Sequence, residues 1–181
     1  GFALGNGEIL FAGIEGDEKS LEAHDGACLA ACADPDGLAL LSAGDDGRVV
    51  KTDPGGAQSV LFDEFGRFID QITAADWGGI AFADGRKLYV LMPDGKMKRY
   101  HAKSQVGGLA FSPKGRKLAI SRYNGASVYW VGTDREKPEE YNWNGAHGIV
   151  GWSPNADWLV TSMQENALHV WRSDHKKHVR M

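Results

Sequence analysis

The chain has 181 residues, 43% of them hydrophobic and 24% charged, with a formal net charge of −4 at pH 7. This mixture is typical of a globular protein and excludes a largely disordered chain. A nucleic-acid-binding domain usually has a basic face and an excess of positive charge, so the acidic balance predicts no nucleic-acid partner. No apolar run reaches the roughly 18 residues that a membrane helix needs, so no membrane partner is expected either.

The glycine and cysteine residues indicate the structural class and the cellular compartment of the protein. The 24 glycines are scattered along the chain, which predicts many tight turns and therefore short elements of β-structure. The two cysteines, Cys28 and Cys32, are four residues apart. In a strand they would lie about 13 Å apart on one face, which is too far for a disulfide. Free thiols of this kind predict a cytoplasmic protein.

The expected strands follow one another at short intervals. Residues 1–24 contain two of them, at 8–11 and 19–23. The first full set of four is expected at 28–33, 38–43, 48–52 and 58–62. Similar sets begin near residues 69, 106 and 148, and no segment has the 3.6-residue periodicity of a helix.

One marker of an internal repeat is a turn pair followed by a strand-like run. The five pairs are Asn6-Gly7, Asp46-Gly47, Asp84-Gly85, Asn124-Gly125 and Glu165-Asn166. The strands after them end at residues 12, 52, 91, 130 and 171, at intervals of 40, 39, 39 and 41. Such pairs predict two-residue hairpin turns with positive φ at both central positions.

A second marker has the same period. Proline-containing turns are expected at 34–37, 112–115 and 153–156, and a copy without proline near 75–78. Four short antiparallel strands every forty residues are typical of a β-propeller blade. The prediction is an all-β β-propeller with about four four-stranded blades visible, an all-β sandwich with accidental periodicity being the alternative fold. Residues 1–181 are predicted to form one propeller domain or segment, with a partial blade at 1–24 and blade-like repeats at 25–67, 68–104, 105–145 and 146–181.

The repeats resemble those of the WD-repeat family. The resemblance rests on the segment from Ala110 to Gly115 (Ala-Phe-Ser-Pro-Lys-Gly), on Trp152-Ser153-Pro154-Asn155, and on the placing of His24, Trp130 and Trp171. The sequence departs from the family at Thr52 and Leu91, which replace tryptophan, and at Trp143, which stands where the fourth repeat should have histidine.

The resemblance implies a ring of usually seven blades and a hydrogen-bonded network that includes His24 and Ser42. A ring of that size would need about three further blades. The resemblance therefore also predicts a companion chain, or a second copy of this chain, that completes the propeller.

The residues point to binding and not to catalysis. No phosphate loop, nucleophile elbow or zinc-protease motif is present in the sequence, so no catalytic, cofactor or metal site is predicted. His169, His175 and His178 are not interpreted as metal ligands, since no cysteine lies near them. Residues 175 and 178 lie beyond a loop from the strand that contains residue 169, and a solvated loop is the preferred interpretation.

The predicted function is a scaffold that binds a protein or peptide partner on one face of the propeller. Aromatic and arginine residues in loops are the usual anchors of such a face. The candidates are Trp77, Arg122, Tyr123 and Trp143. The alternative function is a propeller-type hydrolase or lactonase with a site at the central channel, for which His101 and His147 are the candidates.

Overall fold

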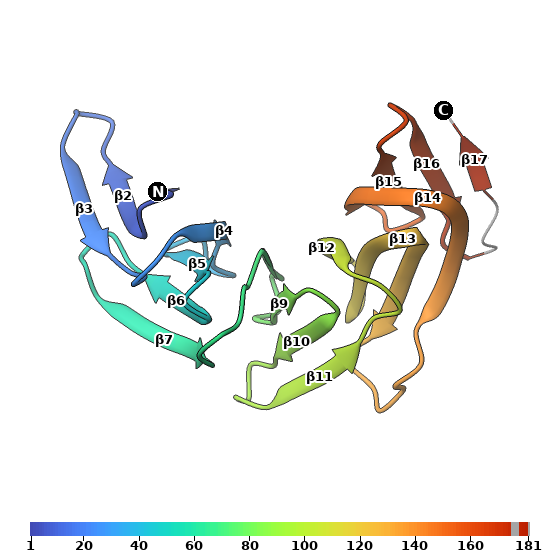
Figure 1. The fold of residues 1–181 in the computed structure, drawn as a ribbon, viewed down its shortest axis with the longest axis horizontal. Coiled ribbons are helices and arrows are strands. Elements are labelled where there is room, and N and C mark those ends of the chain that lie inside the picture. Colours follow the sequence, from blue (N-terminus) through green and yellow to red (C-terminus); the bar gives the residue numbers. More distant parts are fainter. Residues whose placement is uncertain (175–177, 181) are drawn as a thin grey trace. The chain divides into compact units, whose positions relative to one another are not determined.

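The computed structural model describes residues 1–174 and 178–180. Within these residues the regular structure is all β-strand, without a helix (Figure 1). The chain divides into two compact units, Gly1–Gly85 and Arg86–Met181. Within each sheet, a strand pairs antiparallel with the next one along the chain.

The first unit contains two sheets and a hairpin. The first sheet has three strands, β1 (Phe2–Ala3), β2 (Glu8–Ala12) and β3 (Glu18–Glu22). The second has four, β4 (Cys28–Ala33), β5 (Leu40–Gly44), β6 (Arg48–Thr52) and β7 (Gln58–Asp63). They are followed by the pair β8 (Gln71–Ala74) and β9 (Ile80–Asp84).

The second unit begins with the hairpin of β10 (Lys87–Leu91) and β11 (Met97–His101). A longer sheet follows, made of β12 (Val106–Phe111), β13 (Lys117–Trp130), β14 (Glu139–Trp152), β15 (Trp158–Met163), β16 (Leu168–Arg172) and β17 (His178–Arg180).

The two long strands of this sheet each serve as two shorter ones. β13 reverses direction at Asn124 and Gly125, whose φ angles are 62° and 124°, and the N–H of Gly132 donates to the Arg116 carbonyl at 3.4 Å. The first arm of β13 pairs with β12 and the second with the start of β14. The remainder of β14 pairs with β15. The result is two consecutive sets of four strands, the pattern that the sequence predicts for blades.

The hairpin turns differ from those predicted. Both central residues have positive φ at Asn124-Gly125, but at Asp46-Gly47 only the glycine does, with φ 82°. There the N–H of Gly47 donates to the Gly44 carbonyl, which is a type I turn followed by a left-handed residue. The Asp46 carboxylate accepts the N–H of Arg48 at 3.0 Å and stabilises this turn. The prediction of positive φ at both positions is therefore wrong for most of these pairs.

The proline-marked turns are confirmed, including the copy that lacks proline. The N–H of Gly37 donates to the Asp34 carbonyl at 2.9 Å. In the copy without proline, the N–H of Gly78 donates to the Ala75 carbonyl at 2.8 Å. The turn thus depends on the left-handed residue in its last position more than on proline.

Each unit has an apolar core between stacked sheets. In the first unit, Ile9 of the first sheet packs with Val50 of the second. In the second unit, Trp171 and Leu159 pack with Tyr141 and Val128 of the preceding strands. A strand that is covered on both faces is apolar along its length, as β9 is with Ile-Ala-Phe-Ala. The predicted all-β, propeller-type fold is confirmed.

Candidate partner-binding surface

A buried polar network holds the loop before β4 against the β5–β6 turn. His24 lies in that loop, and its Nε2 is 2.8 Å from the Ser42 hydroxyl. Its Nδ1 is 3.0 Å from the Asp46 carboxylate. Burial alone would raise the pKa of Asp46, but the hydrogen bonds from His24 and from the backbone N–H groups of Arg48 and Asp25 lower the pKa below its usual value. The predicted His24–Ser42 contact is confirmed, and Asp46 is the member that sequence reasoning missed.

Related contacts recur in later repeats with other residues. In the first unit, Arg67 contacts the Asp84 carboxylate at 3.4 Å, as His24 contacts Asp46. In the second unit, Nδ1 of His147 lies 2.8 Å from the Thr161 hydroxyl. Sequence spacing places Trp143 at the histidine position of this repeat, but His147, four residues later, supplies the buried ring. These contacts attach the loops rigidly to the strands beneath them.

Two of the predicted anchors lie exposed in the second unit. Tyr123 is 61% exposed at the reversal in the middle of β13. Trp143 is 39% exposed within β14. The buried part of Trp143 packs against the His169 ring, with 4.9 Å between the ring centroids. In the first unit, Trp77 is half-buried in the turn between β8 and β9.

Arg122 does not lie in a loop, which corrects the prediction for its position. It lies within β13, is 3% exposed, and donates to the Glu140 carboxylate at 2.5 Å and to the Ser127 hydroxyl at 2.8 Å. It also donates to the side-chain oxygen of Asn142 at 3.0 Å. Burial alone would raise the pKa of Glu140, but the hydrogen bonds from Arg122, Ser127 and Lys103 hold this pKa below its usual value. Arg122 is therefore a buried residue that holds the side chains of Glu140 and Asn142 in place.

A hollow of about 600 Å³ opens beside Trp143, lined by Asn124, Asn142, Trp143, Asn144 and Glu165. We call this the amide surface. The Asn124 side-chain oxygen accepts the N–H of Gly145 at 3.1 Å, so this amide is held in place as Asn142 is by Arg122. An indole face, three side-chain amides and a carboxylate can hydrogen-bond a peptide backbone and hold a polar or cationic side chain.

One segment of the chain matches a known protein family. Residues 16–51 match the family model of the WD domain, G-beta repeat. This segment is similar to a WD repeat. The matched segment runs from the turn before β3 into β6 and includes the His24, Ser42 and Asp46 network. No curated protein matches the chain.

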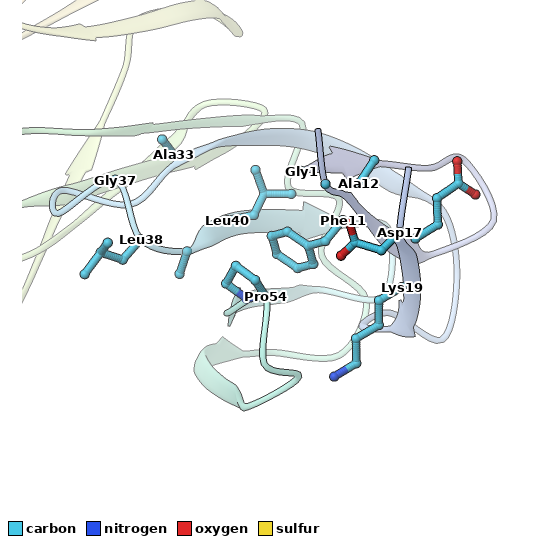
Figure 2. A pocket seen from close by; sticks show the side chains of 13 residues that line it. Gly1, Phe11, Ala12, Asp17, Lys19, Ala33, Gly37, Leu38, Leu40 and Pro54 are labelled. Atoms are coloured by element: carbon cyan, nitrogen blue, oxygen red, sulfur yellow. The ribbon is translucent and has the colours of Figure 1, made fainter. Parts of the chain in front are cut away.

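The first unit, which includes the matched residues, has a larger hollow, of about 640 Å³, where its first and second sheets meet (Figure 2). Phe11, Leu38, Leu40 and Pro54 provide its apolar lining. Phe11 and Leu40 pack on the core between the two sheets. The Lys19 ammonium at its rim donates to the Gly55 carbonyl at 2.5 Å. Its lining thus serves the packing of one sheet on the other.

Not all of the three histidines considered as possible metal ligands lie within the described residues. His169 is fully buried and its ring contacts those of Trp143, His147 and Trp171. His169 lies in β16, in the strand predicted to end at residue 171, but its ring fills a space in the core and is not solvated. His175 lies outside the described residues. Among the residues described, no three His, Cys, Asp or Glu side chains lie close enough to hold a metal ion.

Within the same described residues, no element is a helix long and apolar enough to cross a membrane.

Proposed function

We propose that this WD-repeat protein is a scaffold that binds an extended segment of a partner protein on the amide surface. The observation that carries the proposal is the exposed indole of Trp143 beside a hollow whose amides are already oriented. The WD repeat at residues 16–51 supports a general role in protein interaction. Tyr123, exposed near this surface on the β13 turn next to Asn124, would extend the contact.

The physical argument is one of preorganisation. A partner that binds Trp143 does not need to immobilise it, because the ring already packs on His169. The amides of Asn124 and Asn142 are held by Gly145 and Arg122, so they too lose little conformational entropy on binding. Rigid aromatic side chains in such settings contribute most of the binding energy of protein interfaces.

The alternative of a propeller-type hydrolase or lactonase has no observation in its favour. His147 is 3% exposed and its ring is engaged by Thr161 and by the Trp143 carbonyl. His101 is exposed on β11. A catalytic role for these two residues is therefore not proposed. The cytoplasmic location and the companion chain or second copy stay predictions.

Selection of binding peptides from a random displayed library, followed by titration of one enriched peptide, tests the proposal. Trp143→Ala should weaken its binding by about tenfold or more, the effect of losing an interface anchor. Trp158→Ala is the matched control, because Trp158 is 36% exposed on β15 and does not line the hollow. Equal affinity of the wild type and Trp143→Ala for every enriched peptide would show that the partner binds elsewhere.

A further inference from the structure

The two units carry opposite charge, which the net charge of the whole chain conceals. Residues 1–85 contain 4 Lys and Arg and 16 Asp and Glu, a net charge of −12. Residues 86–181 contain 16 and 8, a net charge of +8. The excess is concentrated in residues 86–137, with 12 basic and 3 acidic residues.

Many of these basic residues gather around β11 and the segment that follows β13. Three adjoining hollows there, of about 240, 440 and 290 Å³, share Arg99 and Tyr100 in their linings. We call this region the basic strip. Its positively charged or protonatable lining residues are Lys87, Lys98, Arg99, His101, Lys103, Arg135 and Lys137.

The internal contacts of the basic strip leave some of its charge available. The Lys98 ammonium donates to the Thr133 carbonyl at 2.8 Å, which attaches the segment after β13 to β11. Lys103 pairs with the Glu140 carboxylate at 3.1 Å. Arg99 and Lys137 are exposed, and neither forms a salt bridge with another described residue. These two cations can therefore pair with an anionic ligand without losing an existing partner.

Two tyrosines support the strip from within. The rings of Tyr100 and Tyr129 pack with 4.8 Å between their centroids, at the junction of the hollows. Burial, together with the nearby Glu140 carboxylate, raises the pKa of Tyr129 to about 12. Its hydroxyl is therefore neutral at physiological pH and remains a hydrogen-bond donor.

We propose that the basic strip binds an acidic segment of a partner protein, an extended stretch with several Asp or Glu side chains. It would be a binding site separate from the amide surface. Each hollow has the size of one or two side chains, which suits separate carboxylates placed between the cations. Asp134, Glu136 and Glu140 also line the strip, so its cations are separated by anions. A peptide whose carboxylates are spaced apart can avoid these anions, whereas a nucleic acid carries a charge at every nucleotide. These features favour an acidic peptide over a nucleic acid.

Fluorescence anisotropy of the full chain with labelled probes tests the proposal. The probes are a peptide of alternating Glu and Gly, a Lys and Gly peptide of the same length, and a single-stranded DNA of the same net charge. The Glu peptide should bind best, and its affinity should fall as salt is raised, because exposed ion pairs are screened. Tighter binding of the DNA would overturn the proposal and indicate a nucleic-acid surface.

Charge-reversal variants locate the site. Arg99→Glu and Lys137→Glu should each weaken binding of the Glu peptide by about fivefold or more, since each replaces attraction by repulsion. Lys114→Glu makes the same change of charge at an exposed turn outside the hollows, and should change affinity by less than about twofold. An equal loss in all three variants would overturn the assignment, because it would show attraction by net charge alone. Trp143→Ala should leave this binding unchanged, which separates the test from that of the amide surface.

Discussion

Buried polar residues in the turns of this protein are held by several partners each, and Asp34 is an example. It is 4% exposed at the end of β4, and one carboxylate oxygen accepts the N–H groups of Leu38 and Ala39 at 2.8 and 3.0 Å. The other oxygen pairs with the Lys51 ammonium at 2.6 Å. Burial alone would raise the pKa of Asp34, but these bonds together lower it below its usual value.

The lowered pKa predicts a defined dependence of stability on pH. An unfolded Asp titrates near pH 3.9, so the stabilisation by Asp34 is present above about pH 4 and is lost as the pH falls through the lower folded-state pKa. Asp34→Asn should therefore unfold more easily than the wild type at pH 7, and the difference should shrink at pH 3. Urea unfolding at the two pH values measures this. Asp36→Asn, at an exposed position in the same turn, is the control and should differ little from the wild type at either pH.

The two thiols should react slowly in the folded protein. Burial, with the nearby Asp34 carboxylate, raises the pKa of Cys32 to about 11, and burial raises the pKa of Cys28 as well. At pH 7.5 fewer than about one Cys32 thiol in a thousand is then ionised, and the thiolate is the reactive form. The rate of labelling by a thiol reagent, before and after addition of denaturant, measures this. Rapid labelling of both cysteines in the native protein would contradict it.

Among the elements, the reversal within β13 depends on glycine. Gly125 has φ 124°, and a Cβ atom there would collide with the carbonyl oxygen of Tyr141 on the paired strand. Gly125→Ala should therefore lower the melting temperature more than Gly95→Ala does. Gly95 has φ 81° but open space around it, so both variants bear the cost of a left-handed alanine, about 1–2 kcal/mol, and only one bears the collision. Equal melting temperatures would show that the two paired strands separate at little cost.

Sequence patterns predict these elements well where alternation and turn residues agree. Residues 28–33 and 48–52 are strands with the predicted bounds. β5 begins at Leu40 and not at residue 38, because the Asp34 carboxylate binds the N–H groups of Leu38 and Ala39 and keeps them in the turn. A pattern of apolar residues does not show such a side-chain contact.

At the scale of the whole molecule, the sequence predicts the repeat more readily than the surfaces. The period follows from turns and strands that recur in every repeat. The amide surface joins residues from different turns, and Arg122 could be recognised as a buried support only from its contact with Glu140. The opposite net charges of the two halves of the sequence indicate the basic strip, but the net charge of the whole chain does not show this difference.

A core substitution should have an effect concentrated in one half of the chain. Trp171 is 2% exposed, and the residues of its cluster all belong to the second unit. Trp171→Ala should destabilise the protein by about 3–5 kcal/mol, as other losses of a buried aromatic ring do. In hydrogen exchange, protection should fall more in residues 86–174 than in residues 1–85, because repeat proteins are stabilised mainly by contacts between neighbouring repeats. An equal fall in both units would argue against this locality.

The pairing of each strand with its neighbour in the chain also has a consequence for the time course of folding. Most contacts in such a meander join strands that are close in sequence. The slow search for distant strand partners, which delays the folding of other all-β proteins, is therefore short. A hairpin can form in about 1–10 μs, whereas a ribosome adds roughly 5–20 residues each second. Each group of four strands therefore has seconds in which to pair before the next one is synthesised. We expect the repeats of this chain to be acquired in order, from the amino terminus, while translation continues.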